Sequence, residues 1–305
     1  MARRARLGAT AITVLVLAGC GGGSGTGSAT SAASAASAAP AVEAASSVPV
    51  DTAAFSDPLR IDNTWFPMTP GTQLVLEGEA NRGRGELAHR VVITVTDLSK
   101  VVHGVRARVV WERDVNEGTL RETELAFFAQ DDAGNLWNLG EYPEENENGQ
   151  FSGAPNAWLA GQANARAGLL MRADPKVGTE SYVQGYSPDI EFLDEAMVSK
   201  TGERVCLPAS CYDDVVVVDE WSPLDPTSGH QLKYYAKGIG SVQVAPVGGD
   251  ARETLNLTSI TQISPEALAQ ARDAVIALDR HAYDVAPDIW ADTPRATVPG
   301  VPTTL

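Results

Sequence analysis

The 305-residue sequence is poor in the residues that build metal and redox centres, with three cysteines and four histidines. The histidines show none of the H-x-H, H-E-x-x-H or i,i+4 spacings that hold a metal ion in many proteins. Each lies at an expected turn, strand end or helix end, which predicts solvated side chains for His89, His103, His230 and His281. The sequence therefore indicates no cofactor and no histidine-based metal centre.

Basic residues are scarce as well: 23 Lys and Arg stand against 39 Asp and Glu, for a formal net charge of -16. Proteins that bind nucleic acid need a positive surface to meet the phosphates. The charge balance excludes nucleic acid as an expected partner. The surplus carboxylates are predicted to form a solubilising surface.

Familiar catalytic signatures are missing too. The chain has no G-x-S-x-G elbow for a serine hydrolase, and no glycine-rich phosphate loop follows an expected strand. Its one conspicuous apolar run, residues 11–17, is too short to span a bilayer. With no visible nucleophile, the sequence predicts a protein that is not an enzyme, although a triad assembled from distant residues stays open.

The N-terminus has the three regions of an export signal. Three arginines lie within the first six residues, the apolar run follows, and small residues precede a cysteine. The stretch Leu17-Ala18-Gly19-Cys20 resembles the lipobox of bacterial lipoprotein precursors. That resemblance implies cleavage after Gly19, acylation of Cys20 with palmitate or similar chains, and a lipid anchor on the extracytoplasmic face of a bacterial cell membrane. An ordinary secretory signal with an incidental cysteine is the alternative.

Composition divides the chain into five segments. Residues 1–19 are the expected signal peptide, and residues 20–50 a flexible Gly/Ser/Ala spacer that begins at the lipidated cysteine. Residues 51–263 are the expected β domain, and residues 264–283 a helix with Ser264 as its N-cap. Residues 284–305 are predicted to be an extended tail.

The β domain is predicted from apolar residues that alternate with polar ones over many short segments. Leu125 and Phe127 are expected to face the core, and Glu122 and Glu124 the solvent. We expect a mainly β fold, a curved antiparallel sheet forming an open barrel or a sandwich, with one C-terminal helix. Residues 141–150 are predicted to be an acidic loop, and residues 151–178 a long irregular excursion.

Two further features carry specific predictions. Cys206 and Cys211 flank a natural turn in an exported protein, so a disulfide is expected. Asp131, Asp132 and Asn135 offer oxygen ligands to Ca²⁺, but their spacing does not match an EF-hand loop, and a β turn favours the same residues. They remain weak calcium candidates.

The β region resembles uncharacterised bacterial exported proteins over three stretches, Pro70 to Gly78, Phe128 to Trp137 and Lys233 to Gly240. The last stretch also resembles the strand ending of curved-sheet envelope proteins that carry lipids. No functional residue can be transferred from these stretches. The oligomeric state stays open.

Two functions follow as hypotheses. The first is a non-enzymatic binding or interaction module, anchored to the membrane through Cys20, with an apolar small molecule or lipid held in the concavity of the sheet. The second is a surface hydrolase with glycans as its expected substrate class, with carboxylates on loops and tryptophans that stack on sugars. A hydrolase is expected to bring two carboxylates, or Ser with His, together in a cleft, whereas a binding module is expected to show an apolar concavity without clustered titratable groups.

Overall fold

The computed structural model describes residues 50–81, 85–249 and 252–299. The predicted signal peptide, the lipobox with Cys20 and nearly all of the spacer lie outside these residues. Within them, no helix combines the length and apolar character needed to cross a bilayer.

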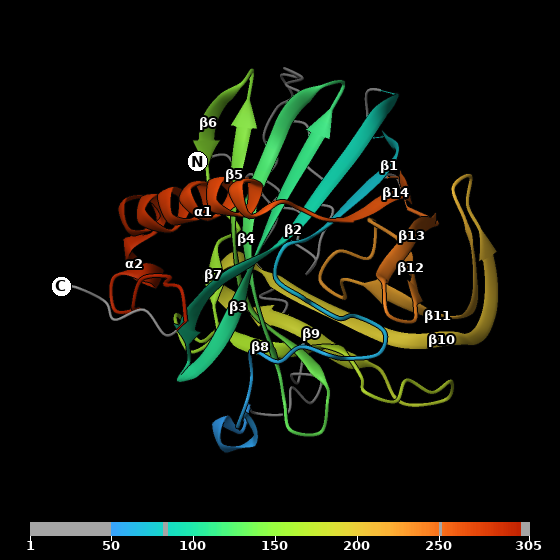
Figure 1. Cartoon of the computed structure of the whole chain (residues 1–305), viewed down its shortest axis with the longest axis horizontal. Helices are drawn as coiled ribbons and strands as arrows, with labels where there is room; N and C mark the ends of the chain where they lie inside the picture. Colours follow the sequence, from blue (N-terminus) through green and yellow to red (C-terminus); the bar gives the residue numbers. More distant parts are fainter. Residues whose placement is uncertain (1–49, 82–84, 250–251, 300–305) are drawn as a thin grey trace, which may run out of the picture.

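The described chain is mainly β and antiparallel, as predicted, with a helical C-terminus (Figure 1). Its strands are β1 (Thr72–Asn81), β2 (Glu86–Val102), β3 (Val105–Asn116), β4 (Thr119–Gln130), β5 (Leu136–Glu147), β6 (Gln150–Gly153), β7 (Trp158–Leu159), β8 (Arg166–Met171), β9 (Tyr182–Ser187), β10 (Phe192–Cys206), β11 (Cys211–Trp221), β12 (His230–Ala236), β13 (Gly240–Val247) and β14 (Arg252–Gln262). Its helices are α1 (Pro265–Val285), α2 (Pro287–Trp290) and the 3-10 turns η1 (Thr52–Ala54) and η2 (Pro188–Ile190).

Twelve of the described strands form a closed barrel. β1 pairs with β14 from Thr72↔Gln262 onward, and β4 pairs with β5, which joins the two ends of the strand order. β6 and β7 pair with β5 outside this ring. The closed pairing decides between the barrel and the sandwich that the strand pattern left open.

The inner face of the barrel is identified by one apolar cluster that draws residues from every strand of the ring. Its members include Leu76, Val91, Val110, Ala126, Leu136, Leu170, Tyr182, Ala196, Val218, Tyr235, Val242 and Leu255. Phe66, from the segment that precedes β1, joins this cluster and packs against Tyr235 with ring centroids 5.4 Å apart. The apolar end of the interior is therefore filled by the chain's own side chains.

A second apolar cluster lies on the outer face, beneath the helix. Val275 and Ala282 of α1 pack with Leu125 and Phe127 of β4. Figure 1 shows α1 lying across the strands from β5 toward β2. The helix begins as predicted, since the Ser264 hydroxyl accepts a hydrogen bond from the Ala267 amide at 3.2 Å. It satisfies an amide that would otherwise lack a helical partner.

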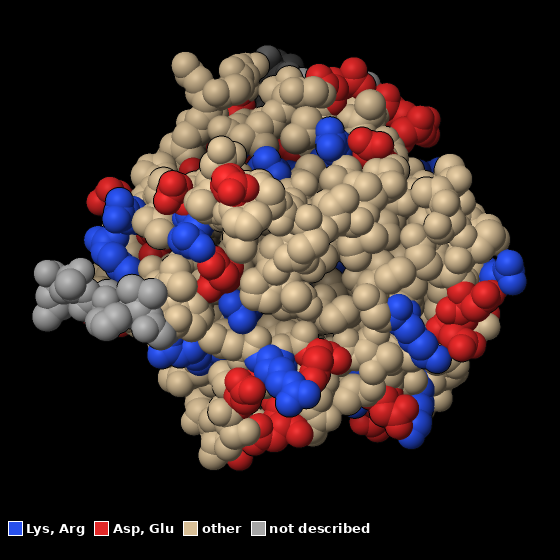
Figure 2. Space-filling model, in the orientation of Figure 1, with Lys and Arg blue, Asp and Glu red and all other residues tan. Residues whose placement is uncertain are grey.

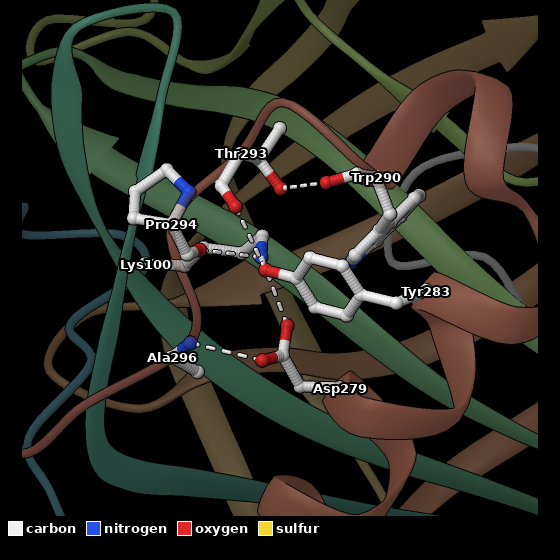
Figure 3. A network of polar contacts seen from close by, with 7 residues as sticks. All are labelled: Lys100, Asp279, Tyr283, Trp290, Thr293, Pro294 and Ala296. Atoms are coloured by element: carbon white, nitrogen blue, oxygen red, sulfur yellow. Dashed lines mark hydrogen bonds and ion pairs between the residues drawn. The ribbon is translucent and has the colours of Figure 1, made fainter. Parts of the chain in front are cut away.

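A buried lysine attaches this helix to the barrel wall (Figure 3). Lys100 of β2 is 1% exposed, and its ammonium group donates to Asp279 of α1 at 2.9 Å and to the Tyr283 hydroxyl at 3.0 Å. It also donates to the Pro294 carbonyl at 2.7 Å. All three N–H groups of the lysine are used, which compensates for its burial.

The remainder of the same network fixes the tail. The second oxygen of Asp279 accepts from the Ala296 amide at 2.9 Å, and the Tyr283 hydroxyl donates to the Thr293 carbonyl at 2.9 Å. Trp290 is completely buried. The prediction of an extended tail is therefore wrong in part, because the short helix α2 forms. Trp290, the one residue of the tail expected to dock, packs into the outer cluster.

Two other predictions for the β domain need correction. Residues 141–150 are not a loop, because β5 continues to Glu147 and finds partners in β4, β6 and β7. The stretch 151–178 contains β7 and β8, so it is more regular than predicted. Strand partners outweighed the low β-propensity of the glutamates here. The expected disulfide is present, and joins Cys206 at the end of β10 to Cys211 at the start of β11.

Candidate functional site

The inner face of the barrel changes from apolar to charged along each of several strands, and always toward the same end. On β3 the step runs from Val110 to Glu112, and on β4 from Ala126 to Glu124. The same step occurs on β11 and β12, which bring in Glu220 and Lys233. Because side chains two residues apart share a face, these charged groups all point into the barrel.

We call Glu112, Glu124, Glu141, Glu220 and Lys233 the inner carboxylate layer. Its side chains are between 1% and 4% exposed. The layer is hidden from the surface, where Figure 2 shows acidic and basic side chains interspersed around the edge of one face. The solubilising surface predicted from the composition therefore accounts for only part of the acidic residues.

Strand register brings three of these carboxylates together. Glu112 and Glu124 are direct partners across β3 and β4. Glu141 of β5 is the partner of Ala126, which is the next inward-facing residue of β4 after Glu124. Direct partners on one face of an antiparallel pair have Cβ atoms about 4.5–5.5 Å apart. Like charges at that spacing repel, so the layer disfavours full ionisation.

Glu141 is held in place by its neighbours. Its two oxygens accept from Asn138 at 2.8 Å and from the indole N–H of Trp158 at 3.1 Å. The preceding Gly140 has φ of 150°, and a Cβ there would lie 2.6 Å from the Trp158 carbonyl oxygen. Only glycine lets β7 approach closely enough for this indole to reach the carboxylate.

Burial shifts the protonation of the layer. It raises the pKa of Glu112 to about 8, with repulsion from Glu141 adding to the effect and Lys233 opposing it. It raises the pKa of Glu141 to about 7, against the hydrogen bonds from Trp158 and Asn138. It also raises the pKa of Glu124 well above the ordinary value, reinforced by Glu141 and Glu112. Near neutral pH, the layer holds protons that exposed glutamates would have released.

Glu220 and Lys233 form an ion pair on the opposite side of the layer from Glu112 and Glu124. The ammonium group of Lys233 lies 2.6 Å from Glu220 Oε2, and the Gln184 amide donates to Glu220 Oε1 at 3.1 Å. Tyr182 and Tyr235 lie nearby, and burial, then the charge of Glu220, raises the pKa of both hydroxyls. Both tyrosines stay protonated at any physiological pH.

His89 corrects the prediction that the histidines are solvated. It is 2% exposed and faces inward from β2, with Nε2 3.1 Å from Asp114 Oδ1 and Nδ1 2.8 Å from Glu253 Oε1. Burial alone would lower the pKa of His89, but the hydrogen bonds and charges of the two carboxylates outweigh it and raise the pKa to about 9. The imidazolium bridges β3 and β14 across β2 and β1.

The calcium candidates occupy a turn at the other end of β4. Asp131 accepts from the amides of Ala133 and Asn135 and from the Trp137 indole N–H at 2.8 Å. Asp132 accepts from the amide and hydroxyl of Ser56, at 3.0 and 2.6 Å. These oxygens shape the turn and fix the segment before β1. In the ranges that the structure describes, no three His, Cys, Asp or Glu side chains are arranged to hold a metal ion.

Comparisons with known proteins place the chain near two solved structures. One is a protein from Bacteroides fragilis assigned as exported and having a YmcC-like fold, with 16% identity, a TM-score of 0.39, and coverage of 65% of this chain and 99% of that one. The other is a protein from Parabacteroides distasonis assigned as a lipoprotein, with 14% identity, a TM-score of 0.37, and coverage of 66% and 100%. No family model and no curated protein matches the chain.

The prediction from sequence missed Glu112 and Glu141, and placed Glu122 and Glu124 in solvent. Glu122 is 3% exposed, like its neighbours in the barrel. One signal was available. On β4 the face that carries Glu124 continues as Ala126 and Phe128, so both faces of the strand end in apolar residues. A strand buried on both faces cannot have a solvated polar face.

Proposed function

We propose that this chain is an extracytoplasmic lipoprotein, anchored through Cys20, whose barrel is a non-enzymatic binding module. The observation that carries the proposal is the inner carboxylate layer, because buried carboxylates lower stability unless they are paired, and clusters with displaced pKa values gather at functional sites. The ligand site moves from the apolar concavity expected from the sequence to this polar layer. The apolar end is occupied by Phe66 and Tyr235.

Native mass spectrometry of the protein recovered from bacterial membranes in mild detergent tests the binding function. We expect a ligand adduct on the wild-type protein that is diminished in Glu124→Gln. Glu147→Gln is the matched control, since Glu147 is exposed on the same β5 end of the barrel. Recovery of the unliganded mass alone would refute the binding module.

The anchor has its own test. Because acylation of Cys20 supplies two or more chains at roughly 0.8 kcal/mol per buried methylene, the wild-type protein is expected in the membrane fraction. Cys20→Ala removes the acceptor thiol, and we expect that variant in the soluble extracytoplasmic fraction. A Cys20→Ala protein that sediments with membranes as completely as the wild type would contradict the anchor.

The hydrolase is retained as a second candidate because the convergence of Glu112, Glu124 and Glu141 is the arrangement expected of it. A general acid needs a raised pKa, and Glu112 and Glu141 have one. The carboxylates lie on strands inside the barrel and not on loops, and their exposure of at most 4% is low for a cleft that admits a glycan. Release of reducing sugar from envelope glycans by the wild type, lost in Glu141→Gln and kept in Glu147→Gln, would favour this candidate.

A further inference from the structure

The inner carboxylate layer has more hydrogen-bond acceptors than donors. Its four glutamates present eight oxygens; Asn138 and Trp158 donate to Glu141, and Gln184 and Lys233 serve Glu220. Among the residues that the structure describes, neither oxygen of Glu112 has a hydrogen-bond partner, and Oε1 of Glu124 also lacks one. Acceptors buried without donors are costly, so this arrangement favours a donor supplied from outside the chain.

Gln184 provides a second and independent observation. Its side chain is fully buried, and its amide N–H donates to Glu220, which places its carbonyl oxygen beside the layer. That oxygen has no hydrogen-bond partner in the described ranges. A neutral side chain thus shows the same lack of a donor as the glutamates do. The deficit is not explained by protonation of the carboxylates alone.

The ring has more strands than the smallest barrels. Eight-stranded barrels have an interior that side chains can just fill, and the interior widens roughly in proportion to the number of strands. This ring has twelve strands. Large apolar side chains fill one end of it, whereas the layer at the other end is built from four glutamates and one lysine, with Gln184 beside it.

We propose that the inner carboxylate layer binds an organic cation with several N–H donors, such as a primary ammonium or guanidinium group. This inference rests on the proposed binding function and names its ligand class. Such a cation supplies both the positive charge and the donors that the layer lacks, as Lys233 already does for Glu220 at 2.6 Å. A metal ion fits less well, because no three-residue ligand set was found in the described part of the chain.

Binding is coupled to proton release. Glu112, Glu124 and Glu141 have raised pKa values, so near neutral pH the empty layer retains protons, and an arriving cation favours the ionised form. Each carboxyl that ionises passes its proton to solvent while the cation takes its place. Lys233 and Glu220 belong to the layer, and the titratable groups that interact with it from outside are Glu122, Tyr182 and Tyr235.

Isothermal titration calorimetry of the detergent-solubilised full-length protein at pH 7 tests the inference, with 1,4-diaminobutane as the probe. We expect saturable binding, and a heat that changes between buffers of different ionisation enthalpy because protons are released. Tetramethylammonium has the charge but no N–H donor, and is expected not to bind. Glu112→Gln and Glu124→Gln should each weaken binding at least tenfold, and Glu147→Gln should not.

Three results would overturn the inference: no saturable binding of 1,4-diaminobutane to the folded protein, equal binding of tetramethylammonium, or unchanged affinity in both layer variants. Circular dichroism establishes that each variant is folded, and Glu112→Gln removes a buried ionisable group, which favours folding. A neutral or apolar adduct found by native mass spectrometry would support the binding module and overturn the cation. The two proposals therefore fail separately.

Discussion

At the scale of single residues, Glu112 shows how the barrel interior makes stability depend on pH. Its pKa is about 8 in the folded protein and about 4.5 in an unfolded chain. Below about pH 4.5 the carboxyl is protonated in both states. Between these two pH values only the folded state keeps the proton. The free energy of unfolding that the protonated Glu112 contributes is therefore lost as pH rises toward 8.

We predict that Glu112→Gln flattens this part of the pH dependence. Relative to wild type, the variant should gain free energy of unfolding between pH 5 and pH 8.5, on the order of 2 kcal/mol. Urea unfolding at the two pH values measures the difference. Glu147→Gln is the control and should follow wild type. Parallel wild-type and Glu112→Gln curves would show that Glu112 titrates normally.

His89 contributes in a separate window. Its pKa is about 9 when folded and about 6.5 when unfolded, so its favourable contribution is complete below about pH 6.5 and is lost as pH rises through 9. The decline that Glu112→Gln retains above pH 7 is therefore expected to come from His89 together with Glu124, whose pKa is also raised. Neither Glu112 nor His89 could be located by sequence, since their partners Asp114, Glu253 and Glu141 come from strands far apart in the chain.

At the scale of elements, the attachment of α1 depends on Lys100. We predict that Lys100→Met destabilises the protein by about 3 kcal/mol or more, because Asp279 is left buried without its cation. Hydrogen exchange should become faster along α1 while the barrel strands stay protected. Thermal unfolding and exchange by mass spectrometry measure the two effects.

Two further variants separate the ion pair from general loss of a lysine. Lys176→Met removes an exposed lysine paired with Asp174, and should change stability by less than about 1 kcal/mol. The double variant Lys100→Met/Asp279→Leu removes both buried charges and should recover part of the loss. A double variant that is less stable than Lys100→Met would contradict this account.

The sequence predicted the positions of helices and strands better than it predicted which face of each strand points into the barrel. Period-two alternation located most strands, and the Ser264-Pro265 signal located α1, because both depend on local chemistry. The same alternation could not say what covers each face. Leu125 and Phe127 do face an apolar core, but it is the one beneath α1, while Glu124 faces the interior. Which face is inside depends on ring closure, which joins strands that are distant in sequence.

At the scale of the molecule, the barrel depends on its last strand. β14 pairs with both β1 and β13, so a chain that ends at Gly249 opens the ring and leaves β1 and β13 with one partner each, β2 and β12. We predict that this chain does not unfold cooperatively in urea. A chain that ends at Ile263 keeps the ring but exposes the outer cluster, and should fold with reduced stability. Cooperative unfolding of the shorter chain would show that closure is dispensable.

The pairing of β1 with β14 also fixes an order of events in time. Thr72 and Gln262 are neighbours in the ring although roughly 190 residues separate them along the chain. At about 5–20 residues per second of synthesis, the partner of β1 is made some ten to forty seconds after β1 itself. A chain delivered across a membrane N-terminus first, as proposed above, cannot complete its barrel before export is nearly finished. Until β14 has been made, β1 has only β2 as its partner and the ring stays open.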